Sequence, residues 1–165
     1  YEMKTDNMAD FVANVNYDRS LFISKLENRS FIDQRLIGLS VKNEFQDVNK
    51  ILYLALLNCT ASLFLIESFG FGRGLGALDL RATKFERDCK ILNPNILTDE
   101  QKLQIVELFR PMMQRNRLPL EQELESADRI AFENALMEIY GISEYYEPIK
   151  NSLKQLYRIR FAVKN

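Results

Sequence analysis

The residues best suited to chemistry lie in a cluster of glycines near the middle of the chain. Residues 69–76 read Phe-Gly-Phe-Gly-Arg-Gly-Leu-Gly, and Arg73 is the only charged residue among them. Glycine adopts positive φ and lets a ligand come close to the backbone, and a guanidinium binds a phosphate or the edge of a guanine. We therefore expect Arg73, Gly74 and Gly76 to contact a nucleic acid here. The alternative is a tight turn that ends a helix and serves packing alone.

A nucleotide-binding loop is disfavoured at these glycines. Such a loop lies between a strand and the start of a helix, whereas this cluster follows a helix-like apolar run and leads into a short strand-like segment at residues 77–80. Phe69 and Phe71, beside the glycines, are interpreted as core anchors, with a wedge at a base step as the alternative.

Four cations follow the cluster at every third position: Arg81, Lys84, Arg87 and Lys90. A helical turn would place them on one side, although Glu86 and Asp88 interrupt the run in sequence. This basic stripe is the best candidate for a surface that faces DNA, and a solvated face with local ion pairs is the alternative. A second basic run near the C-terminus is interpreted as helix C-terminal cations that the helix dipole favours: Lys150, Lys154, Arg158, Arg160 and Lys164.

The chain lacks the residues that most catalytic and zinc sites need. It has no histidine, which excludes every mechanism that uses a histidine base. Its two cysteines, Cys59 and Cys89, are too far apart for a Cys-x-x-Cys pair, so we expect reduced thiols and no structural zinc. We therefore expect no catalytic residue, no metal and no cofactor within this chain.

Composition is that of a globular domain. The 165 residues are 47% hydrophobic and 27% charged, and 22 basic against 23 acidic residues give a net charge of -1. A nucleic-acid partner must therefore bind to a local basic patch, because the chain as a whole is nearly neutral.

The longest uncharged run, Ile51 to Ile66, is too short and too polar for a membrane span and indicates a buried helix. The start at Tyr1, without a leader, predicts a fragment of a longer cytoplasmic protein.

Two patterns divide the chain into a strand-rich part, residues 1–97, and a helical part, residues 98–165. Apolar residues alternate in residues 11–17 and 37–41, which predicts two to four antiparallel strands within residues 8–43, with a turn at residues 27–30. A helix over residues 47–68, capped by Asp47, follows, and then come the glycine turn and the short strand. The fold class is therefore α+β.

The helical part is predicted from caps and periodicity. Thr98 and Gln101 have the spacing of a capping box. One face of that helix is expected to carry Leu103, Val106, Phe109 and Met113. Pro111 is expected to kink or end it. After a charged connector at residues 115–125, a second helix runs from Ser126 to a left-handed cap at Gly141, and a third opens at Ser143.

One segment looks like a family signature. It reads Leu56-Leu-Asn-Cys-Thr60, then an apolar helix, then Gly72-Arg-Gly-Leu-Gly-Ala-Leu-Asp-Leu80. This resembles the target-recognition region of N6-adenine DNA methyltransferases of restriction-modification systems, and the closing helices, such as residues 128–142, are similar to the tail of those proteins. The resemblance covers roughly residues 31 to 160. It implies that the chain binds double-stranded DNA while an upstream catalytic domain transfers a methyl group from S-adenosylmethionine.

The sequence also departs from that family. Cys59 stands where the family has serine, and Asp79 stands where it often has lysine, so a DNA-contacting lysine cannot be assigned there. The catalytic tetrapeptide is absent, since Asn93-Pro94-Asn95-Ile96 has one proline and no aromatic residue. The resemblance therefore implies a recognition region whose catalytic site lies elsewhere. The competing hypothesis is a protein-interaction module whose C-terminal helices dock a partner subunit or the catalytic domain of the parent protein.

Overall fold

The computed structural model describes residues 8–41, 49–72 and 76–162. The strands are β1 Met8–Asn14, β2 Asn16–Tyr17, β3 Ser24–Phe31, β4 Leu36–Leu39, β5 Phe71–Gly72 and β6 Leu78–Asp79. The helices are α1 Lys50–Leu57, α2 Thr60–Phe69, α3 Ala82–Asp88, α4 Asp99–Gln114, α5 Leu120–Glu123, α6 Ala127–Ile139 and α7 Tyr146–Ala162, with short 3-10 helices η3 Pro94–Ile96 and η4 Ser143–Tyr145. The predicted α+β class is confirmed.

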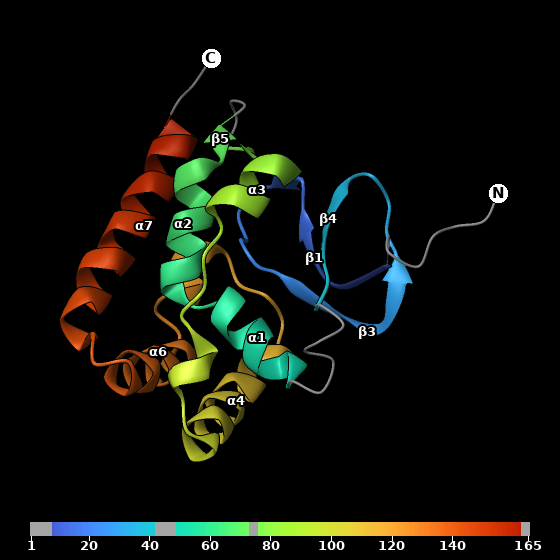
Figure 1. The fold of residues 1–165 in the computed structure, drawn as a ribbon. Coiled ribbons are helices and arrows are strands. Elements are labelled where there is room, and N and C mark those ends of the chain that lie inside the picture. The colour runs from blue at the N-terminus through green and yellow to red at the C-terminus, as the bar shows by residue number, and fades with distance from the viewer. Residues whose placement is uncertain (1–7, 42–48, 73–75, 163–165) are drawn as a thin grey trace.

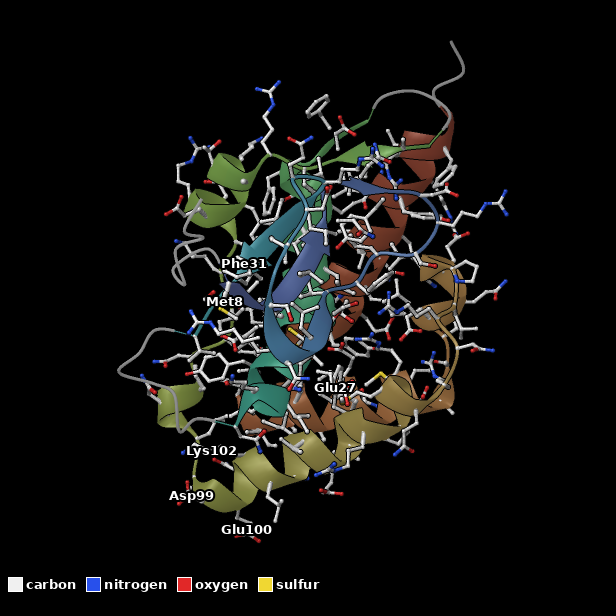
Figure 2. All side chains as sticks on the ribbon, turned by 90° about the vertical axis from the view of Figure 1, so that its right-hand side faces the viewer. Met8, Glu27, Phe31, Asp99, Glu100 and Lys102 are labelled. Carbon is white, nitrogen blue, oxygen red and sulfur yellow. The ribbon has the colours of Figure 1, made fainter. Side chains whose placement is uncertain are left out.

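The first sheet is antiparallel, in the order β3-β1-β4. Its strands confirm the prediction for the N-terminal part, but the turn predicted at residues 27–30 is wrong, because these residues lie inside β3. Ala9 pairs with Ser30 while Phe11 pairs with Lys25, so β3 carries several extra residues in between. This irregularity accommodates the polar residues that the sequence favoured as a turn. Figure 2 shows Met8 and Phe31, which are paired in this ladder, side by side at one end of it.

The single helix predicted over residues 47–68 is wrong, because the chain breaks at Asn58 and Cys59. The two helices on either side, α1 and α2, are bent by 57°. The Asn58 side chain donates to the carbonyls of Ile23 and Leu54 and accepts from the Ile23 amide, so it pulls the chain toward β3. Burial of the segment is nevertheless as predicted. The predicted cap Asp47 lies outside the described residues, and Asn49 caps α1 by accepting from two amides.

The helical part follows its local signals with two exceptions. The capping box of Thr98 and Gln101 is confirmed, and Gly141 adopts φ +66° after α6 as predicted. Pro111 does not end α4, which continues to Gln114, and the kink that was the other expectation at Pro111 stays a prediction. The exposed position of Pro111 leaves its ring toward solvent, and the packing of Phe109 and its neighbours on α6 holds the helix together.

The expected apolar face of α4 is partly wrong. Val106 and Phe109 are buried, together with Ile105, but Leu103 is 60% exposed and Met113 is 43% exposed. The buried face is rotated toward α6 and α1, which pack against α4. Leu103 and Met113 therefore lie at the edges of the contact or beyond it.

Figure 1 shows how the elements surround one core. The long helix α7 runs beside α2, the β1 sheet covers another side, and α4 and α6 close the end opposite to α3. A single hydrophobic cluster joins residues from both predicted parts, from Phe11 of β1 to Leu153 of α7. Within the described ranges, no single helix is long and apolar enough to cross a membrane. The bent pair α1 and α2 has the length and composition, and most of its residues are buried in the core.

Candidate nucleic-acid interface

The described flanks of the glycine cluster, β5 and Gly76, lie at the same end of the molecule as α3, beside the last turn of α7 (Figure 1). The second sheet, in the order β2-β6-β5, frames the cluster, because Phe71 and Asn16 both pair with Asp79 of β6. The predicted contacts Arg73 and Gly74 lie outside the described residues. We call the small antiparallel sheet of β2, β6 and β5 the frame, and it lies at the two described ends of the glycine turn.

Gly76 is the glycine whose conformation the frame requires. It is buried and adopts φ +84°, which only glycine adopts readily. A Cβ at this position would meet the ring of Phe161 of α7, and the Gly76 carbonyl accepts a hydrogen bond from Arg160 Nη1. The close approach predicted at Gly76 is therefore made by α7 in the structure. This supports the packing alternative for Gly76, while contact with DNA at this position stays a prediction.

The predicted basic stripe is built on α3. Phe85 on the inner face is buried and packs edge-to-face on Phe69, with ring centroids 5.8 Å apart. This contact fixes the orientation of α3, and the remaining faces are left to solvent. The cations of the stripe are all exposed: Arg81, Lys84, Arg87 and Lys90.

The cations of the stripe differ in what else they bind. Lys84 Nζ donates to the Phe69 carbonyl at 2.8 Å and so caps the end of α2. Arg87 pairs with Asp88 through Nε and Oδ1 at 2.7 Å, and the hydrogen bond from Arg87 lowers the pKa of Asp88. The Arg81 guanidinium lies over the Phe71 ring, 5.2 Å from its centroid. Among the residues that the structure describes, Arg81 and Lys90 form no ion pair.

The helical geometry only partly matches the predicted alignment. Lys84 and Arg87 lie within α3, whereas Arg81 is its N-cap and Lys90 follows its end. The interrupting acid Asp88 attracts Lys84, Arg87 and Lys90 together, as the lowered pKa of its carboxyl indicates. The stripe therefore combines the predicted basic surface with local ion pairing.

Asp79, for which the sequence resemblance suggested a lysine position, is buried in β6. Its carboxylate accepts a hydrogen bond from the Asn16 side chain of β2. It thus joins the two strands of the frame from within, where a DNA phosphate has no access.

Sequence reasoning missed the side chain that holds this frame. Arg160, interpreted from the sequence as one of several helix C-terminal cations, is only 6% exposed and donates to the carbonyls of Tyr17, Asp18 and Gly76 as well as to Glu67. The signal was present, because Arg160 follows the buried Tyr157 at helical spacing on the inner face of α7. Arg160 is therefore a structural cation at the base of the glycine turn.

The two cysteines are free, and burial raises the pKa of each thiol to about 11. No group of three or more His, Cys, Asp or Glu side chains that could hold a metal ion occurs in residues 8–41, 49–72 and 76–162. Comparisons of the chain with known protein families, curated proteins and solved structures gave no match.

Proposed function

We propose that this chain is the DNA target-recognition region of an adenine-specific DNA methyltransferase of a bacterial, cytoplasmic restriction-modification system. In this proposal the chain holds double-stranded DNA, and an upstream catalytic domain transfers the methyl group from S-adenosylmethionine. The observation that carries the proposal is the exposed basic stripe on α3 beside the glycine turn. The resemblance of residues 56–80 to the methyltransferase family supports the same conclusion from the sequence.

The interactions of the stripe suggest a division of roles. Arg81 and Lys90 form no ion pair in the described ranges, so they are the cations best able to bind phosphate without first breaking an ion pair. Lys84 and Arg87 must give up or share the Phe69 carbonyl and Asp88. Arg73 stays the predicted contact to a base edge or a phosphate.

The test is a titration of fluorescent duplex DNA with the chain at several salt concentrations. We expect binding at low salt that weakens as salt rises, because each bound phosphate releases counterions. The double variant Arg81→Ala/Lys90→Ala should lower the magnitude of the slope of log K against log salt by about 1 for each cation that binds a phosphate in the unmodified chain. Arg35→Ala is the matched control, because Arg35 is an exposed arginine of the β3–β4 connection.

Two results would contradict the proposal. One is the absence of duplex binding at low salt, and the other is equal binding by the stripe variant and the Arg35→Ala control. Equally weakened binding in both variants would indicate that general charge, and not the stripe, attracts the DNA.

A second candidate function is a protein-interaction module. It is favoured by three exposed apolar residues on or just before α4: Ile96 at 64%, Leu103 at 60% and Met113 at 43%. Exposed apolar side chains of this size are common at protein interfaces. If Leu103→Asp/Met113→Asp abolishes the self-association or partner binding of the chain and the stripe variant leaves every interaction unchanged, this second function replaces the first.

A further inference from the structure

We propose that a cavity between the start of β3 and the segment that joins α4 to α5 is a binding site for a phosphate group, with Arg117, Lys25 and Ser24 as its ligands. This site does not involve the glycine turn or α3. It goes beyond the function proposed above, because it assigns a second anion site built from other elements.

The cavity has a volume of about 220 Å³ and is lined from two sides. Residues 21–25 form one wall, and residues at the end of α4 and in the following connector form the other. Its inner end is formed by buried groups such as Leu54, Asn58 and Arg129, and its outer end by exposed ones such as Met113 and Arg117. A ligand can therefore enter from solvent and still lie against buried walls.

The polar lining is cationic. Four basic side chains and one carboxylate line the cavity: Lys25, Arg115, Arg117, Arg129 and Glu123. Two of the four cations are already neutralised. Arg115 pairs with Glu123 at 2.8 Å and with Asp128 at 2.6 Å, and Arg129 pairs with Glu123 at 2.9 Å.

The other two cations, Arg117 and Lys25, form no ion pair with any residue that the structure describes. Arg117 Nη2 donates to the Ser24 hydroxyl at 2.6 Å, and its guanidinium carbon lies 3.1 Å from the centroid of the Phe22 ring. Lys25 Nζ donates only to the neighbouring Leu26 carbonyl at 3.2 Å. Both residues line the cavity, and each cation keeps N–H groups that no described residue accepts from.

The Phe22 ring covers one face of the Arg117 guanidinium and attracts it, but no carboxylate among the described residues pairs with this cation. Burial accordingly lowers the pKa of Arg117, and the Tyr17 hydroxyl opposes this only in part. An anion beside Arg117 would supply the charge partner that the described residues do not provide. The geometry alone, with two unpaired cations at one opening, points to the same ligand charge.

Phosphate is the anion that these donors fit. Arg117 offers a planar set of N–H groups for two phosphate oxygens, and Lys25 offers a compact charge. Ser24 accepts from Arg117, so its own O–H can donate to a third oxygen. The rest of the lining is largely apolar, from Phe22, Leu118 and the methionines, and would contact the group that the phosphate esterifies.

The phosphate could come from a DNA backbone or from a small free phosphate ester, and one experiment with two arms separates these sources. In the first arm, the melting temperature of the full chain is measured with sodium phosphate and with sodium chloride at equal ionic strength. Binding to the folded state raises the melting temperature by mass action. We expect phosphate to raise it more than chloride. Arg117→Ala/Lys25→Ala should weaken phosphate binding about tenfold or more, because it removes charge-assisted hydrogen bonds.

Three further variants complete this arm. Arg117→Lys/Lys25→Arg keeps both charges and should keep much of the phosphate response, which separates the removal of charge from misfolding. Arg35→Ala removes an exposed arginine elsewhere and should leave the response unchanged. Arg81→Ala/Lys90→Ala should also leave it unchanged, so failure of the stripe and failure of this site can be told apart.

The second arm measures duplex DNA binding by the same variants. Weaker duplex binding by Arg117→Ala/Lys25→Ala, together with an abolished phosphate response, assigns the site to the DNA backbone. Unchanged duplex affinity with an abolished phosphate response assigns it to a small phosphate ester. The inference is overturned if phosphate and chloride act alike on the unmodified chain, or if Arg117→Ala/Lys25→Ala responds to phosphate as the unmodified chain does.

Discussion

Arg160 of α7 and Glu67 of α2 form an ion pair inside the molecule, with 2.8 Å between Nε and Oε1 and side chains only 4% and 2% exposed. The same guanidinium donates to the carbonyls of Tyr17, Asp18 and Gly76. One side chain therefore joins the two long packed helices to β2 and to the end of the glycine turn.

Breaking this pair should destabilise the fold strongly. Arg160→Met leaves the Glu67 carboxylate buried without its partner, and such changes cost about 3–5 kcal/mol. Urea unfolding of the full chain measures the destabilisation, and Arg160→Met/Glu67→Met should recover part of it, because no buried charge is then left. The control is Arg158→Ala, since Arg158 pairs with Glu121 at the surface and its removal should cost less than about 1 kcal/mol. Equal costs for Arg160→Met and Arg158→Ala would contradict the structural role of Arg160.

Asn58→Ala tests the break between α1 and α2. The substitution leaves the buried amide and carbonyl of Ile23 without the partners they have in the structure, at about 1–3 kcal/mol for each group. The expected decrease in the free energy of unfolding is about 2–6 kcal/mol. Asn49→Ala removes the exposed cap of α1 and should cost only about 1 kcal/mol. A smaller decrease for Asn58→Ala than for Asn49→Ala would show that the break does not depend on the Ile23 hydrogen bonds.

Three positions in residues 56–80 have structural contacts that account for their residue types. Asn58 binds the β3 side of the molecule, the Thr60 amide donates to Glu133, and Gly76 lies under Phe161. All three belong to the segment that looks like the methyltransferase signature. The described part of that segment therefore serves the packing of α1, α2, α6 and α7.

Local rules made the correct structural predictions. The capping box of Thr98 and the positive φ of Gly141 depend on residues within one turn of the chain, so the sequence was sufficient. The continuous helix over residues 47–68 was wrong because the partner of Asn58 lies 35 residues away. Leu103 was placed on the buried face because periodicity finds an apolar stripe but cannot show where α6 packs against it.

The candidate sites also divide into those that depend on local sequence and those that depend on long-range packing. The basic stripe on α3 could be predicted, because the spacing of its cations is local. The phosphate cavity could not, because Ser24 and Arg117 are separated by 93 residues and meet only through the packing of β3 against the connector. Arg160 is an intermediate case between these two. The periodicity of α7 places it on the inner face of that helix, but the sequence does not show that its partner is Glu67.

Gly76→Ala should be more costly than the same change at Gly141. Both glycines have positive φ, at +84° and +66°, so each substitution carries the roughly 1–2 kcal/mol that a left-handed alanine costs. At Gly76 the new methyl group also meets the Phe161 ring, whereas at Gly141 nothing lies within 4 Å of it. Thermal and urea unfolding should therefore show a clearly larger destabilisation for Gly76→Ala. Phe161→Ala in the same chain should make the effect of Gly76→Ala smaller, and an unchanged effect would exclude the steric explanation.

Acid should weaken the interaction between Asp128 and Arg115. The hydrogen bond from Arg115, 2.6 Å from Nε to Oδ2, is the main cause that lowers the pKa of Asp128 to about 2 from an ordinary 3.8, and partial burial opposes it. Because the pKa is lower in the folded state, the carboxylate stabilises the fold above about pH 4, and this stabilisation is lost as the pH falls from about 4 to about 2. Its size is about 1–2 kcal/mol after allowance for solvent screening. The difference in unfolding free energy between the unmodified chain and Asp128→Asn should therefore be constant from pH 7 to 5 and shrink toward pH 2.

The control is Asp99→Asn, because the Asp99 carboxylate is 98% exposed, and its unfolding free energy should show no comparable pH-dependent change. If the difference for Asp128→Asn persists undiminished at the lowest pH, the role assigned to the Asp128 carboxylate is contradicted.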